Sequence, residues 1–217
     1  MSSKFWNRGL IAVALVVLLL LSALNMHLKA KSNDCQASLP SEVGVKALSP
    51  HKYQLAYVYF GEDKTFLCVT DADGQSEPKV IASFSRPQFI SNIVWSNNGQ
   101  KIAYIVDSGF DDAVVTKAAL WVYDFKSMIF WQISSDSTTL AFDPAWSPND
   151  KYLAYSARNE LQDFDIYVAD ISTGKTMFSA GNTGVSDVEP SWWDNNLIGF
   201  TVLPENGISS FGRIQIP

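Results

Sequence analysis

The hydrophobic residues of this chain follow two different patterns. Gly9 to Leu28 form one apolar block of 20 residues without Asp, Glu, Lys or Arg. A helix of that length is about 30 Å long, which matches the hydrocarbon core of a membrane. Beyond residue 47, short apolar runs alternate with turn residues, as they do in β-proteins. The pattern predicts a membrane helix followed by a β-domain.

The apolar block divides the N-terminal part of the chain into three segments. We predict a short cytoplasmic tail (1–8), a transmembrane helix or signal anchor (9–28) and a polar tether (29–46). A cleaved secretory signal is the alternative, but Leu28-Lys29-Ala30 is a poor cleavage site. Under either interpretation the rest of the chain is exported. If the segment is an uncleaved anchor, the lipid bilayer is a partner of residues 9–28.

Four segments of the remaining chain repeat one pattern. The first three start with a large apolar residue, pass through Ser and a turn, and end in an apolar strand with Ala-Tyr; the fourth is one residue shorter. The segments are 48–57, 95–104, 146–155 and 192–200. Their first positions are 47, 51 and 46 residues apart. We therefore expect structural units that start near residues 47, 94, 145 and 191.

Each complete unit has the residues of four strands. After the repeated strand pair come a variable loop, a third strand that ends in Asp71, Asp124 or Asp170, a second turn and a fourth strand. Four strands in about 45 residues are typical of a propeller blade. The sequence therefore predicts an all-β fold, a partial or small β-propeller of about four blades. The fourth unit ends in its third strand, so we expect the tether strand or another chain to cover its edge, unless the chain is a truncated relative.

The third unit carries the clearest motif. Trp146–Tyr155, preceded by Asp143-Pro144-Ala145, resembles the blade motif of the TolB-type WD-like propeller repeats, and Glu189-Pro190-Ser191-Trp192 repeats the lead-in. The resemblance covers residues 47–217, although the translocation member of that family has six blades. Together with the predicted span at 9–28, it implies a propeller in the periplasm that is anchored in the inner membrane by a single span. Such blades occur in translocation proteins, sensor domains and peptidase accessory domains, so the resemblance leaves the function open.

The composition argues against several classes of function. The 22 Asp and Glu residues outnumber the 16 Lys and Arg residues, for a net charge of −6, which argues against a nucleic-acid binder. Two His and two Cys leave little for metal or nucleophilic chemistry. The sequence has no Gly-x-Ser-x-Gly elbow, and its paired carboxylates do not follow the spacing of a calcium loop. We expect no enzyme activity, no cofactor and no metal site.

Two sets of residues have structural interpretations. Trp95, Trp146 and Trp192 stand at the same repeat position, so they form either a ring of ligand-stacking aromatics or the packing between neighbouring blades, and the regular recurrence favours packing. Cys35 in the tether and Cys68 in a predicted strand either form a disulfide in an exported chain or stay reduced, with Cys68 buried.

Acidic residues gather in segments that we place on one face of the propeller. These are Glu62, Asp63, Asp107, Asp111, Asp112, Asp136, Asp143, Glu160, Asp163, Asp187 and Glu189. The face either serves solubility or steers a basic partner. The least repeat-like segment, 105–119, is predicted to be a loop that contacts a protein partner. Its proposed contact residues are Asp107, Phe110, Asp111, Asp112, Val114 and Val115.

The function predicted from the sequence is that of a membrane-anchored, non-catalytic protein-interaction module. The alternative is an accessory structural subunit of a respiratory or photosynthetic inner-membrane complex, whose half-propeller caps the periplasmic side. A sensor domain of a membrane regulator is weakened by the eight residues before the span, which are too few for a DNA-binding domain.

Overall fold

The computed structural model describes residues 43–50, 54–73, 75–111, 114–133, 140–159, 161–181 and 183–216. Within these ranges every helix or strand element is a β-strand. No helix in this part of the chain is long and apolar enough to span a bilayer. The predicted tail, the predicted span and the tether up to residue 42 lie outside the described residues.

The strands form four antiparallel sheets, which we call blades 1 to 4. The blades start at residues 43, 89, 141 and 185, each a few residues before the start of a predicted unit. Blade 1 contains β1 (Val43–Leu48), β2 (Gln54–Phe60), β3 (Lys64–Asp71) and β4 (Lys79–Ser85). Blade 2 contains β5 (Phe89–Trp95), β6 (Lys101–Asp111), β7 (Val114–Asp124) and β8 (Ile129–Gln132). Blade 3 contains β9 (Ala141–Trp146), β10 (Tyr152–Arg158), β11 (Phe164–Asp170) and β12 (Lys175–Ala180). Blade 4 has three strands, β13 (Val185–Trp192), β14 (Leu197–Pro204) and β15 (Ser210–Gln215).

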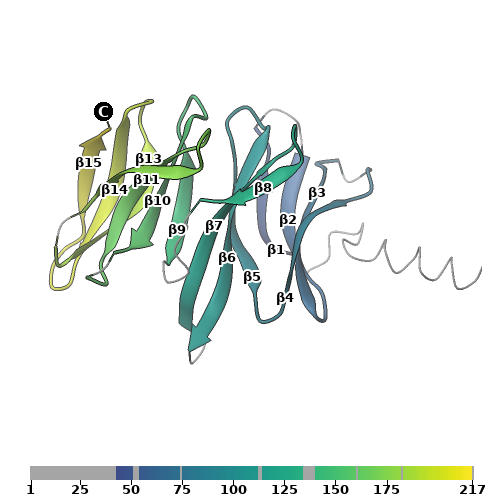
Figure 1. The fold of residues 1–217 in the computed structure, drawn as a ribbon, viewed down its shortest axis with the longest axis horizontal. Coiled ribbons are helices and arrows are strands. Elements are labelled where there is room, and N and C mark those ends of the chain that lie inside the picture. The colour runs from purple at the N-terminus through teal and green to yellow at the C-terminus, as the bar shows by residue number, and fades with distance from the viewer. Residues whose placement is uncertain are drawn as a thin grey trace, which may run out of the picture.

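The blades follow one another in a row. The first strand of each blade contacts the first strand of the next, from β1 through β5 and β9 to β13. Figure 1 shows blade 1 and blade 4 at opposite ends of this row. The all-β, propeller-type arrangement predicted from the repeats is therefore confirmed. Within the described residues the fourth blade has three strands.

Two segments differ in their structure from the sequence prediction. β1 starts at Val43, inside the predicted tether, and pairs with β2, so this strand belongs to blade 1 and does not complete blade 4. Residues 105–119 are not a loop, because β6 and β7 continue as a long hairpin whose register shifts around Gly109. The extra residues of this unit therefore lengthen two paired strands, and Val114 and Val115 suit that position as β-branched residues.

The core lies between the blades. Successive side chains of a strand point to opposite faces of its sheet, so they alternate between the preceding and the following blade. Between blades 1 and 2, Val58 and Leu67 pack with Ile102 and Tyr104. Between blades 2 and 3, residues such as Leu120 from one blade pack with others such as Leu153 from the next. Between blades 3 and 4, Ala154 and Val168 pack with Ile198 and Ile216. We call each of these contacts between neighbouring blades a seam.

Candidate functional site: a groove at the seam of blades 1 and 2

The repeated tryptophans hold the seams together. Each donates its indole N–H to a carbonyl on the inner strand of the preceding blade, and Trp95 and Trp146 are 8% exposed. The bonds run from Trp95 to Ala47 at 2.9 Å, from Trp146 to Val94 at 3.3 Å and from Trp192 to Ala145 at 2.9 Å. These contacts are packing between blades, so the tryptophans do not line a ligand-stacking ring.

A bulge in each of three inner strands adds a polar contact. Asn92, Asp143 and Glu189 each stand three residues before a seam tryptophan, with φ angles of 53°, 51° and 56°. The carboxylate of Asp143 accepts hydrogen bonds from the Glu189 backbone N–H and from the Asn92 and Ser156 side chains. Burial and the charge of Glu189 raise the pKa of Asp143. Asp143 and Glu189 therefore belong to inner strands and not to an acidic loop face, and Asp187 is fully buried in β13.

The turns at the opposite end of the strands are joined as well. The carboxylate of Asp150 accepts hydrogen bonds from the backbone and side chain of Asn97, at 2.7 and 3.0 Å, and from the backbone N–H of Asn98 at 2.9 Å. This contact joins the first turn of blade 3 to the first turn of blade 2.

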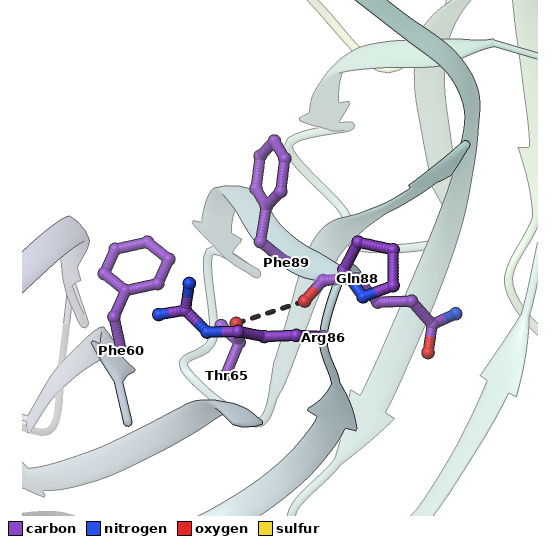
Figure 2. A pocket seen from close by; sticks show the side chains of 6 residues that line it. Phe60, Thr65, Arg86, Gln88 and Phe89 are labelled. Atoms are coloured by element: carbon purple, nitrogen blue, oxygen red, sulfur yellow. Dashed lines mark hydrogen bonds between the residues drawn. The ribbon is translucent and has the colours of Figure 1, made fainter. Parts of the chain in front are cut away.

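A groove with a cavity volume of about 760 Å³ lies where blade 1 passes into blade 2. Its lining residues are Phe60, Thr65, Arg86, Pro87, Gln88 and Phe89. Figure 2 shows the Arg86 side chain extending towards Phe60, with the ring of Phe89 above it in this view. The groove therefore has two aromatic walls and one cation.

Backbone contacts fix the connection that carries Arg86. Thr65 Oγ1 donates to the carbonyl of Gln88 at 3.2 Å, and the Arg86 backbone N–H donates to the carbonyl of Asp63 at 3.0 Å. The Arg86 guanidinium donates to the carbonyl of Gly61 at 3.0 Å. Over the described ranges, the one salt bridge joins Lys101 and Asp124, so Arg86 pairs with no carboxylate there. The guanidinium, a fork of five donors, can bind an incoming carboxylate.

The groove was missed at the level of sequence. Phe60 and Arg86 are far apart along the chain, and only the pairing of β2, β3 and β4 brings them to one seam. The signal that was present is the short Arg86–Gln88 connection between Ser85, where β4 ends, and the aromatic Phe89, where β5 begins. Such connections tend to carry binding residues when a rigid scaffold positions them.

The structure describes the side chains of two predicted partner-binding residues, Asp107 and Val115, and neither is fully exposed. Asp107 is 2% exposed in β6, where it accepts a hydrogen bond from Ser91 Oγ at 2.7 Å, and burial raises the pKa of this carboxyl. Its assignment as an exposed steering charge is wrong, because strand pairing continues through it. Val115 is half-buried against the core between blades 2 and 3. Residue Asp112 and the side chains of Phe110, Asp111 and Val114 lie outside the described part.

The predicted disulfide between Cys35 and Cys68 stays a prediction. Cys68 is fully buried in β3 and is not a free thiol, whereas Cys35 lies outside the described residues. Among the described residues there is no group of three or more His, Cys, Asp or Glu side chains placed to hold a metal ion.

The arrangement of these blades is shared with solved propeller structures. No protein-family model and no curated protein sequence matches this chain. A protein from Agrobacterium tumefaciens assigned as TolB matches with a TM-score of 0.58 and 12% identity, over 82% of this chain and 63% of that one. This chain therefore shares a β-propeller type of fold with that protein. The C-terminal WD40 domain of Sif2 matches with a TM-score of 0.55 and 14% identity, over 80% of this chain and 46% of that one.

The same arrangement of blades also matches part of a peptidase structure. Porphyromonas gingivalis dipeptidyl peptidase 4 matches with a TM-score of 0.58 and 12% identity, over 80% of this chain and 31% of that one. The chain thus spans less than two thirds of the length of each of these three structures. At such identities the likeness establishes the fold alone.

Proposed function

We propose that this chain is a non-catalytic protein-interaction module, a propeller-type domain that residues 9–28 anchor in the inner membrane with the blades in the periplasm. The fold that it shares with TolB-type and WD40 propellers supports an interaction role. The uncharged segment 9–28 supports the anchor.

The observation that carries the proposal is the groove between blades 1 and 2. Phe60 and Phe89 offer apolar walls, and Arg86 offers donors that no carboxylate of the described residues takes. This combination suits a protein segment that places an apolar side chain between the rings and a carboxylate on the guanidinium. Arginine and aromatic residues are also the side chains that most often dominate binding energy at interfaces.

Two variants of the groove test this function. Arg86→Ala and Phe89→Ala should each reduce the recovery of specific co-purifying proteins, measured by quantitative mass spectrometry after purification of the full chain in mild detergent. The control is Lys126→Ala, which removes an exposed cation from the turn after β7, at the other end of the strands. A set of co-purifying proteins that is the same in all three variants and the wild type would count against the groove.

A second candidate is an accessory structural subunit of a larger inner-membrane complex. Exposed aromatic residues on blade 4 favour it, because a chain that is permanently bound can keep such residues covered. A stable, stoichiometric assembly with several other chains in mild detergent would distinguish this role from that of a module that binds in the groove.

A further inference from the structure

One face of blade 4 is covered by no other blade within the described residues. Ile198 and Ile214 point towards blade 3 and pack with Ala154 and Val168. Because side chains alternate along a strand, the residues between them point the other way. We call this surface the open face, and it consists of Gly199, Thr201, Leu203, Phe211 and Arg213, with Trp193 and Glu189 at its border.

Phe211 occupies a position that is buried in every other blade. It pairs with Thr201 on the neighbouring strand. The matching pairs in blades 1, 2 and 3 are Val58–Leu67, Ile105–Leu120 and Ser156–Ile166. Leu67, Leu120 and Ile166 are 0% exposed, whereas Phe211 is 61% exposed. A large aromatic side chain therefore stands in solvent where the fold normally places a core residue.

Trp193 extends this apolar surface. Its ring stacks on Phe211, with 5.4 Å between the ring centroids and 12° between the planes, and it is 52% exposed. Both rings lie over Gly199, where an added Cβ would collide with Phe211 and approach Trp193 to 3.1 Å. The equivalent of Trp193 in the other blades is a buried serine; these are Ser49, Ser96 and Ser147. Blade 4 thus carries aromatic residues at two positions where the other blades do not.

The open face also carries one charge of each sign. Arg213 is exposed on β15, at a position equivalent to the buried Val122 of blade 2 and Val168 of blade 3. Glu189 is exposed as well, and its Oε2 accepts a hydrogen bond from Thr201 Oγ1 at 3.0 Å. An interface around a twofold axis must be complementary to itself. A face with an aromatic centre, one cation and one anion meets that requirement, although the chain as a whole carries −6.

Blade 1 of another copy is a poorer match for this face. The residues of blade 1 that point away from blade 2 form a buried cluster, with Tyr57 at 2%, Phe66 at 8% and Cys68 at 0% exposure. In addition, Leu48 takes the place of the seam tryptophan, so blade 1 has no indole N–H to donate. These features argue against a head-to-tail ring.

We propose that the open face of blade 4 is the interface between two copies of this chain, which pack face to face around a twofold axis. Phe211 and Trp193 form the centre of the contact, and Arg213 of each copy faces Glu189 of the other. The inference does not depend on the groove between blades 1 and 2. A contact formed by three short strands is small, so we expect a dimer that dissociates at micromolar concentration.

The test measures the oligomeric state of the full chain in mild detergent by sedimentation, from about 1 to about 100 µM. We expect a concentration-dependent dimer. Phe211→Ala and Arg213→Glu should each raise the dissociation constant about tenfold or more. Combining Glu189→Arg with Arg213→Glu should restore the dimer, because the swapped charges face each other again. Arg86→Glu is the matched control, since it makes the same change of charge far from blade 4 and should leave the dimer unchanged.

Three results would overturn the proposal. These are a monomer over the whole concentration range, a dimer that Phe211→Ala and Arg213→Glu leave unchanged, and a stoichiometric complex with a different protein that covers Trp193 and Phe211. The thermal midpoint of every variant is measured alongside. Arg213→Glu and the charge swap decide the test if Phe211→Ala does not fold. The groove variants Arg86→Ala and Phe89→Ala should leave dimerisation intact. The co-purification experiment therefore tests the proposed function, and sedimentation tests this inference independently.

Discussion

Truncation of Trp146 tests whether the seams hold this fold together. The indole is 8% exposed within the core between blades 2 and 3, and its N–H donates to the carbonyl of Val94 at 3.3 Å. Trp146→Ala removes both the packing and the hydrogen bond, whereas Trp146→Phe keeps most of the packing. The two variants therefore separate the two contributions.

The expected loss follows from the buried area. A tryptophan side chain buries about 200 Å², which at about 25 cal/mol per Å² corresponds to about 5 kcal/mol at most. Alanine retains part of this burial and the neighbours relax partly, so we expect Trp146→Ala to lower the free energy of unfolding by about 3–5 kcal/mol. We expect Trp146→Phe to cost about 1 kcal/mol, mainly the hydrogen bond, which is the longest of the three seam bonds.

The measurement is urea unfolding followed by circular dichroism. Trp193→Ala is the matched control, because Trp193 is 52% exposed, and its truncation should cost about 1 kcal/mol or less. If Trp146→Ala cost no more than Trp193→Ala, the interpretation of the repeated tryptophans as the packing between blades would be refuted.

Further predictions concern one turn, one buried carboxyl and the N-terminus. Asp150→Ala removes the acceptor of three hydrogen bonds from Asn97 and Asn98 and should lower the unfolding free energy by about 1–3 kcal/mol; an unchanged urea midpoint would contradict this. Burial raises the pKa of Asp107, so its contribution to stability is fully present below the ordinary aspartate pKa of about 3.9 and is lost as pH rises through the raised value. The thermal midpoint of the wild type should therefore fall relative to that of Asp107→Asn between acidic and neutral pH, and a difference that does not vary with pH would argue against a buried charge. The intact mass of the mature protein should include residues 9–28, whereas a mature start near Lys31 would show cleavage.

The blades could be predicted from sequence because their seams require the same residue types at the same positions. A tryptophan that reaches a carbonyl of the preceding blade recurs in each of the last three blades, and Ala-Tyr recurs because both faces of that strand are buried. The incomplete fourth unit could be recognised for the same reason. Its alignment with the other units showed that the given sequence ends in its third strand.

Features that depend on how distant strands meet could not be predicted. Asp107 looked like a surface charge, because nothing in its neighbourhood along the chain indicates that Ser91 lies opposite and that the hairpin continues past it. The open face of blade 4 could not be predicted from the sequence either. Phe211 and Arg213 alternate as in any strand, and only comparison with Leu67, Leu120 and Ile166 shows that the phenylalanine stands at a core position.

The direction of the indole bonds has a consequence for folding during synthesis. Each bond links residues 48, 52 or 47 positions apart, and in each the donor lies on the later blade and the acceptor on the earlier one. A blade that leaves the ribosome therefore meets an acceptor that is already in place. Folding can proceed vectorially, one blade at a time from the N-terminal side, with loop closures of similar entropic cost at every step.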